Sequence, residues 1–129
     1  MKFNYKIRYA ETDQMGVVHH ANYLLYLEQA RIDWLEKKGV NYAELEQQGI
    51  MLPVYNINID YKRPIRFGDT VKVDVQRGEM HGVRIPFDYK LYNSKDELIV
   101  EAQVTLIFTS AETRKPIKCP PDLFKILNT

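Results

Sequence analysis

The chain has 129 residues, a length that accommodates one domain with a sizeable core. Lys and Arg number 18 and Asp and Glu 17, so the net charge of +1 provides no basic field for nucleic acid. Hydrophobic residues make up 45% and charged residues 27%, which excludes a disordered chain. A single cysteine, Cys119, excludes an intrachain disulfide. With no signal peptide and no apolar run of about 20 residues, we predict one cytoplasmic domain over residues 1–129, without a membrane span.

The chain opens with a pattern typical of a strand. Apolar side chains at Phe3, Tyr5, Ile7 and Tyr9 alternate with polar ones, which is the period of a half-buried strand. A polar segment follows from residue 11 to residue 16, where Gly16 can adopt a positive φ. We therefore predict a strand that extends to Tyr9 and then a structured loop.

A helical period begins near residue 22 and continues to residue 38. Tyr23, Leu27, Ala30 and Trp34 form one apolar stripe, which Leu24, Ile32 and Leu35 widen. The charged residues Glu28, Asp33, Glu36 and Lys37 lie elsewhere on the helix. Asn41 can cap a short second helix over residues 41–48. Residues 122–127 can form one closing helical turn.

Four more alternating segments predict strands over residues 55–61, 71–75, 85–91 and 100–108. Residues 68–69, 78–82 and 93–96 supply turns short enough for antiparallel hairpins between consecutive strands. Pro86 has no N–H to donate, so it predicts a bulge or an unpaired edge within its strand.

One strand, a long helix and four strands make an α+β fold with a five-stranded antiparallel sheet. Five strands at about 4.8 Å spacing span about 24 Å, whereas a helix is only about 10–12 Å across. The sheet must therefore curl around the helix or share its remaining apolar surface with another subunit. We expect a homo-oligomer.

The segment between the first strand and the long helix contains the candidate chemistry. A helix N-terminus presents unpaired N–H groups, so residues 20–22 could stabilise an oxyanion that develops on a substrate carbonyl. Asp13 could act on the same carbonyl as base or nucleophile. A simpler interpretation is that Asp13 only stabilises its loop.

Other polar residues give weaker signals. His19 and His20 are adjacent and lack the i, i+4 spacing of helical metal ligands, so we predict no metal site and no cofactor. His81 lies in a predicted turn. Glu28 can pair with Arg31 on the helix surface, and it is also a second candidate for a general base.

The run from Tyr9 to Tyr23, continued to Arg31, resembles the signature of the hot-dog-fold acyl-CoA thioesterases of the 4-hydroxybenzoyl-CoA thioesterase and YbgC-like group. This resemblance implies a sheet curled around one long helix and hydrolysis of an acyl-CoA to free acid and CoA. It also implies a homodimer or a homotetramer built as a dimer of dimers.

The resemblance also assigns roles to individual positions. Asp13 matches the catalytic aspartate, which is nucleophile or general base in different members, and Gly16 matches the glycine of the loop. His20 matches the residue whose backbone N–H polarises the thioester carbonyl, and Tyr9 matches a tyrosine of the same site. The sequence departs from many members at Glu11, where Asp is common, and at His19.

Further residues are expected to bind substrate. They are the remaining members of the motif, Val17, His19, Asn22 and Tyr23, together with Arg63, Arg66 and Arg84, which the resemblance makes candidates for the phosphates of coenzyme A. Pantetheine is expected to lie in a crevice between subunits.

Three functions remain open from the sequence. The first is an acyl-CoA thioesterase, whose thiolate leaving group has a pKa of about 8.5 and needs little acid assistance. The second is an acyl-thioester dehydratase or hydratase that uses His20 with Glu28. The third is a non-catalytic acyl-CoA-binding module in which Asp13 only holds its loop.

Overall fold

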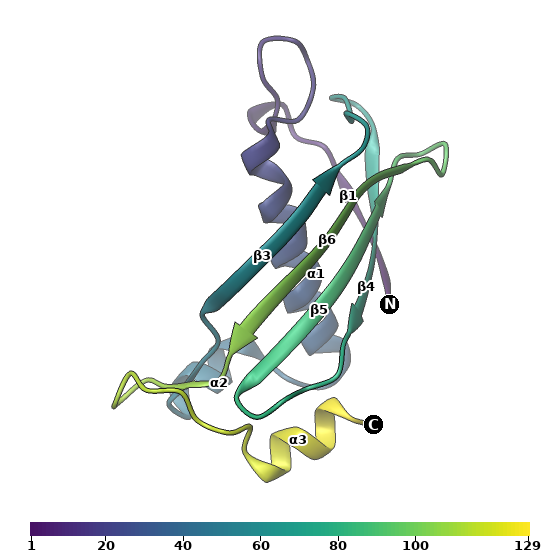
Figure 1. The fold of residues 1–129 in the computed structure, drawn as a ribbon. Helices are drawn as coiled ribbons and strands as arrows, with labels where there is room; N and C mark the ends of the chain where they lie inside the picture. The colour runs from purple at the N-terminus through teal and green to yellow at the C-terminus, as the bar shows by residue number, and fades with distance from the viewer.

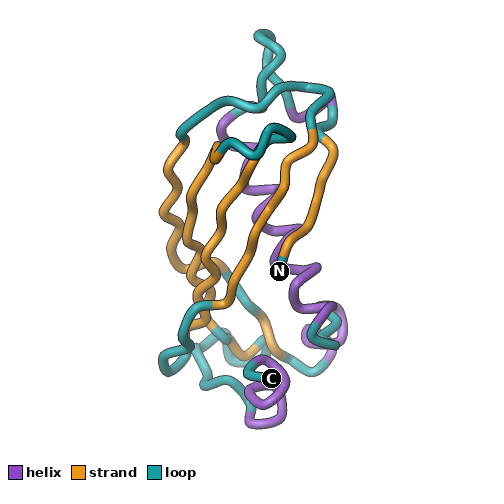
Figure 2. Tube along the Cα trace, turned by 90° about the vertical axis from the view of Figure 1, so that its right-hand side faces the viewer, coloured by secondary structure: helices purple, strands orange, loops and turns teal.

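A computed structural model describes residues 1–129 and shows a five-stranded antiparallel sheet with one long helix across one face (Figures 1 and 2). The order of strands in the sheet is β1-β4-β5-β6-β3. The main elements are β1 (Lys2–Lys6), α1 (Tyr23–Lys37), β3 (Val54–Tyr61), β4 (Thr70–Arg77), β5 (Arg84–Tyr92) and β6 (Leu98–Ile107). The smaller ones are α2 (Tyr42–Gln47), β2 (Ile50–Met51), β7 (Thr109–Ser110), α3 (Pro121–Leu127) and two 3-10 turns, η1 (Tyr9–Glu11) and η2 (His20–Asn22). The predicted α+β architecture is confirmed.

The core lies between α1 and the face of the sheet that α1 covers. Alternate side chains of β4 and β5 are almost completely buried there, and Trp34 of α1 meets Phe87 of β5 edge to face at 5.3 Å between ring centroids. The opposite face of the same strands carries polar and charged side chains. The period-two pattern of these strands therefore reports one buried face, as predicted. None of the helices combines the length and the apolar composition that a bilayer span requires.

The first strand is shorter than predicted. β1 ends at Lys6, and Tyr9 belongs to the 3-10 turn η1 instead of a strand. The carboxylate of Glu11 accepts a hydrogen bond from the backbone N–H of Arg8 at 2.9 Å, which turns the chain before the alternating pattern is complete. This side-chain bond outweighs the apolar periodicity that predicted strand as far as Tyr9.

The predicted hairpin between the second and third strands is wrong. β3 pairs with β6, and β4 lies between β1 and β5. Two strands, β5 and β6, therefore separate β3 from β4 within the sheet. The connection passes instead beside the β1–α1 loop, where the N–H of Val18 donates to the carbonyl of Ile65 at 2.9 Å. The two later hairpins, β4–β5 and β5–β6, are antiparallel neighbours as predicted.

The smaller elements were predicted with mixed success. Asn41 caps α2 by accepting from the N–H of Glu44 at 3.2 Å, and α3 extends over seven residues instead of one turn. The short pair β2 and β7 has no sequence pattern that predicted it. The expected bulge or unpaired edge at Pro86 is wrong, because Pro86 pairs with Thr105 of β6 and its carbonyl accepts the N–H of Gly78 at 2.9 Å on the other side.

β3 forms one edge of the sheet, and its apolar residues are less buried than its alternating pattern predicted. Tyr55, Ile57 and Tyr61 are 56%, 37% and 47% exposed. The single helix does not cover this edge, in line with the difference in width between a five-stranded sheet and one helix.

Candidate functional site

The β1–α1 loop is closed on itself around Asp13. The N–H of Asp13 donates to the carbonyl of Val17 at 2.8 Å, and Gly16, at φ +77°, donates its N–H to the carbonyl of Asp13. Oδ1 of Asp13 accepts the N–H groups of Met15 at 2.8 Å and Val17 at 3.4 Å. Oδ2 accepts no hydrogen bond from the protein and the side chain is exposed, so one carboxylate oxygen remains free to act on a substrate or on water.

Glu11 connects the two ends of this loop to the long helix. Its carboxylate is buried and accepts three hydrogen bonds, from the N–H and Nε of Arg8 at 2.9 Å each and from the hydroxyl of Tyr26 at 2.8 Å. Its backbone carbonyl accepts the N–H of His19 at 3.0 Å and Nδ2 of Asn22 at 2.8 Å. A single residue therefore fixes the loop at its start, at its end and against α1.

The protonation states in this anchor are complementary. Burial raises the pKa of the Glu11 carboxyl, but the hydrogen bonds from the Arg8 backbone, the Tyr26 hydroxyl and the Arg8 guanidinium lower it more, so the net pKa is below its usual value. Burial and the bond to Glu11 raise the pKa of Tyr26. The carboxylate is thus held as the charged acceptor and the phenol as the donor.

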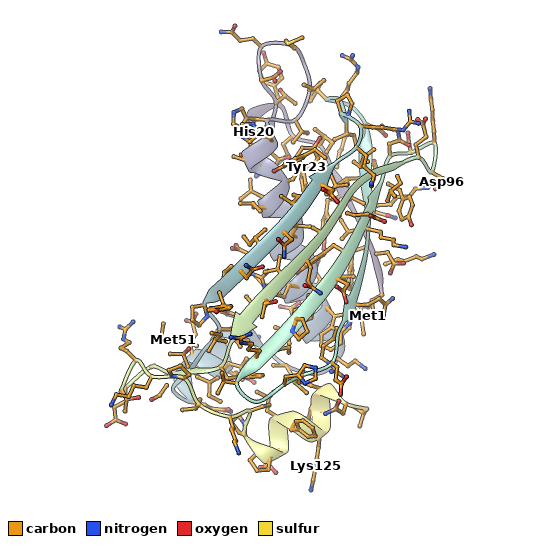
Figure 3. The ribbon with its side chains drawn as sticks, in the orientation of Figure 1. Met1, His20, Tyr23, Met51, Asp96 and Lys125 are labelled. Carbon is orange, nitrogen blue, oxygen red and sulfur yellow. The ribbon has the colours of Figure 1, made fainter.

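A small cleft of about 250 Å³ lies where the 3-10 turn η2 meets the C-terminal end of β3. The hydroxyl of Tyr61 donates to the carbonyl of His20 at 2.9 Å, and the rings of Tyr61 and Tyr23 meet edge to face at 5.4 Å. Figure 3 shows His20 and Tyr23 at the same end of the molecule. The lining residues are Val18, His20, Tyr23, Tyr61, Lys62, Arg63 and Pro64.

The start of α1 differs in detail from the prediction. The α-helix begins at Tyr23, after the 3-10 turn η2, and the side chain of Asn22 bonds the carbonyl of Glu11 and so anchors the loop. His19 caps the 3-10 turn, since its Nδ1 accepts the N–H of Ala21 at 3.2 Å. His20 is the first residue of the turn, a position where the backbone N–H has no intrahelical acceptor. The N–H groups of Ala21 and Asn22 bond the side chain and the carbonyl of His19, so of residues 20–22 only His20 keeps an N–H without an acceptor in the chain. The predicted row of free N–H groups is therefore reduced to one.

The structure brings some of the predicted residues to the cleft and not others. His20, Tyr23 and Arg63 line it, whereas Asp13 lies on the adjoining exposed loop. Tyr9 is 77% exposed and its ring packs edge to face on Phe67, beside the same loop.

The predicted phosphate-binding arginines occupy different places. The side chain of Arg66 is exposed, and its backbone forms an isolated antiparallel β-bridge with Val17 of the loop. Arg63 forms an ion pair with Glu97 at 3.4 Å. Arg84 lies against the ring of Tyr55, at the end of β3 opposite the cleft. Within one chain, Arg84 is therefore separated from the other candidates by nearly the whole length of a strand.

Tyr61 and Lys62 are cleft residues that the sequence interpretation did not assign to the site. They lie about 40 residues from the motif in the sequence, and the path of β3 brings them next to it. The only hint of a site in their own sequence is a tyrosine followed by a lysine at the end of a strand. The alternative pair of His20 and Glu28 is not formed, because the ring of His20 lies beside those of His19 and Tyr61.

Comparison with known sequences defines the class of this protein. Residues 7–127 match the Thioesterase-like superfamily. YneP of Bacillus subtilis (strain 168) is 39% identical over 113 residues, which are 88% of this chain and 82% of YneP. The chain therefore belongs to the Thioesterase-like superfamily, and the resemblance found in the sequence is confirmed.

Two further relatives extend this finding. Acyl-CoA thioester hydrolase YbgC of Escherichia coli O157:H7 is 25% identical over 118 residues, 92% of this chain and 88% of that protein. The crystal structure of DHNA-CoA thioesterase from Staphylococcus aureus has a TM-score of 0.93 and 36% identity, covering 98% of this chain and 87% of that one. The predicted hot-dog fold is confirmed by this likeness.

Proposed function

We propose that the protein is an acyl-CoA thioesterase that hydrolyses the thioester of an acyl-CoA to free acid and CoA. The observation that carries this proposal is the closed loop, in which Glu11 holds Asp13 at a fixed position while Oδ2 of Asp13 stays free. The names of YbgC and of the Staphylococcus aureus thioesterase support the same substrate class.

The residues of the loop suit this chemistry. The thioester carbonyl lies against the free backbone N–H of His20, the first residue of η2, which stabilises the oxyanion. Oδ2 of Asp13 either takes a proton from the attacking water or attacks the carbonyl carbon itself. The C–S bond then breaks, and the thiolate leaves with little acid assistance because the pKa of the thiol is about 8.5. Where Asp13 attacks directly, the acyl group is left on its carboxylate as a mixed anhydride, which water then hydrolyses to release the free acid and restore Asp13. Neither route requires a metal or a redox cofactor.

Basic residues near the cleft suit the phosphates of coenzyme A. Arg66 is exposed beside the loop, and Lys62 and Arg63 line the cleft with side chains that are 41% and 60% exposed. Arg is suited to bidentate phosphate contacts. The acyl group would enter next to the aromatic rings of Tyr23 and Tyr61, and an aromatic acyl group fits the name of the Staphylococcus aureus relative.

We also propose that two copies pair through the edge of β3. The outer side of this strand offers unpaired backbone groups together with exposed Tyr55, Ile57 and Tyr61, a combination that favours the addition of another strand. A second β3 would continue the sheet to ten strands and bring a second subunit next to the cleft. The single free thiol, Cys119, fits a reducing compartment such as the cytoplasm.

The test is Asp13→Asn, assayed by thiol release from a panel of aliphatic and aromatic acyl-CoAs. Asn keeps an oxygen that can accept the N–H groups of Met15 and Val17, so the loop stays closed while the free charged oxygen is lost. We expect kcat/KM to fall about 100-fold or more, as for removal of a general base. Asp122→Asn, at an exposed aspartate of α3, is the control and should leave the rate unchanged.

The outcomes separate the competing functions. A wild-type protein that binds acyl-CoA without releasing thiol would be a binding module. Hydration of an enoyl-CoA without thiol release would indicate a hydratase. Full activity in Asp13→Asn would contradict the role of Asp13 and leave the loop residue with a structural function only.

A further inference from the structure

The peptide group between His20 and Ala21 is bonded by a side chain at each of its two polar atoms. Its carbonyl, that of His20, accepts the hydroxyl of Tyr61 at 2.9 Å. Its N–H, that of Ala21, donates to Nδ1 of His19 at 3.2 Å. Two side chains from distant parts of the sequence therefore hold one peptide group of the turn η2.

This peptide group directly follows the free N–H against which the thioester carbonyl is placed. The N–H of His20 belongs to the preceding peptide group, whose carbonyl, that of His19, accepts the N–H of Asn22 at 2.8 Å. The two peptide groups that flank the Cα of His20 are thus both bonded. Because each peptide group is planar, these bonds together fix the direction in which the N–H of His20 points.

Tyr61 connects the turn to the sheet. It is the last residue of β3 and pairs with Val100 of β6, which is completely buried. Its ring also meets the rings of Tyr23 and His20 edge to face, at 5.4 Å and 6.3 Å between centroids. Positions on strands are held more precisely than positions on loops, so β3 supplies a fixed point for the turn.

His19 supplies the second bond from the start of the turn. It is the N-cap residue of η2, and its own N–H donates to the carbonyl of Glu11 at 3.0 Å, which ties the cap to the anchor of the loop. An N-cap side chain commonly accepts the N–H of the second or third residue of the helix, usually through an oxygen of Asn, Asp, Ser or Thr. In η2, Nδ1 of His19 takes the place of that oxygen.

We propose that Tyr61 and His19 are positioning residues of the hydrolytic site, which together hold the peptide between His20 and Ala21 so that the N–H of His20 points at the oxyanion. An oxyanion donor acts mainly in the transition state, so a badly aimed donor lowers kcat more than it raises KM. Neither side chain has to touch the reacting atoms. This inference rests on the proposed function, because it assigns roles within that reaction.

The first test is Tyr61→Phe, which removes the hydroxyl and keeps the ring that contacts Tyr23. The rate of thiol release is measured with the acyl-CoA that the wild-type protein hydrolyses fastest. We expect kcat to fall about tenfold, the value of one well-made hydrogen bond, with KM within about twofold of wild type. Tyr92→Phe is the matched control, since it removes a hydroxyl from the last residue of β5, which β6 separates from β3, and it should change neither constant. Circular dichroism and urea denaturation verify that each variant is folded.

The second test compares two substitutions of His19. Ala cannot accept the N–H of Ala21, whereas the side-chain oxygen of Asn can do so as an ordinary N-cap. We expect His19→Ala to lower kcat about tenfold and His19→Asn to recover most of that loss. Asn does not replace an imidazole that binds substrate, so equal losses in the two variants would overturn the capping role.

The double variant Tyr61→Phe/His19→Ala tests whether both side chains act on the same peptide group. Independent effects would multiply, so the fold loss of the double variant would equal the product of the two single losses. We expect a clearly smaller loss, because release of either bond already allows the shared peptide group to turn. A loss equal to the product or larger would refute the common action.

Failure of this inference can be distinguished from failure of the proposed function. A wild-type chain that releases no thiol from any acyl-CoA would overturn both. A wild-type chain that hydrolyses acyl-CoA, with Tyr61→Phe equally fast or slowed only through KM, would overturn the positioning role and leave the thioesterase activity in place.

Discussion

Replacement of Glu11 by Gln tests the most demanding part of the site, the anchor that holds the loop. The carboxylate uses Oε1 to accept the N–H of Arg8 and the hydroxyl of Tyr26, and Oε2 to accept Nε of Arg8. The amide oxygen of Gln can keep the first two bonds, but its NH2 group then faces a donor. The side chain of Arg8 is 73% exposed, so it can turn to water at little cost.

The expected loss of stability follows from these contacts. Two hydrogen bonds change from a charged to a neutral acceptor, at about 1 kcal/mol each, and the exposed ion pair adds at most about 1 kcal/mol. Glu11→Gln should therefore lower the free energy of unfolding by about 2–3 kcal/mol at pH 7, as measured by urea denaturation. Glu112→Gln, at an exposed glutamate without a partner, serves as the control and should change it by less than about 0.5 kcal/mol.

The difference in unfolding free energy between wild type and Glu11→Gln should also depend on pH, and it should become smaller in acid. Because the folded-state pKa of Glu11 lies below its ordinary value of 4.5, the carboxylate contributes stability above pH 4.5, which is lost as the pH falls through the folded pKa. The gap between wild type and Glu11→Gln should narrow in that acid range. A gap that is the same at pH 7 and pH 3, or a variant as stable as wild type at pH 7, would refute the anchor.

Two further predictions concern the backbone and the cysteine. Gly16 has a φ of +77° and an added Cβ would meet no atom within 4 Å, so Gly16→Ala should cost about 1 kcal/mol of unfolding free energy from backbone strain alone; an unchanged urea midpoint would contradict this. Burial raises the pKa of Cys119 from 9.0 to about 11, so iodoacetamide should alkylate it about 100-fold more slowly at pH 7.5 than a free cysteine. Labelling at the rate of a free thiol would show that this region opens readily.

The central strands and the long helix could be predicted from the sequence because their packing in the fold buries the same side chains that their local apolar pattern marks. β4 and β5 have partners on both sides and one face against α1, so period-two alternation maps directly onto burial. The order of strands was less accessible. Consecutive strands usually pair, but the segment between β3 and β4 bonds to the β1–α1 loop instead. No local pattern in the sequence records a contact with residues about 50 positions earlier.

For the candidate site, the sequence predicted the loop but not what holds it. The motif from Tyr9 to Tyr23 is continuous in the chain, so its residues stay together in any fold. Glu11 was noted only as a departure from a common Asp, although its carboxylate and its carbonyl organise the whole segment. Hydrogen bonds of this kind depend on the position of Tyr26 on the helix, which a pattern of apolar residues does not specify.

The open edge of β3 and the cleft adjoin one another at the C-terminal end of β3. The cleft measures about 250 Å³, below the roughly 300–1,000 Å³ typical of ligand sites. It ends at Tyr61, which is the last residue of the edge strand β3, so a strand added at this edge would also add a wall to the cleft. The exposed apolar residues of β3 and the small size of the cleft then have one explanation, since a second copy of the chain would cover the first and enlarge the second.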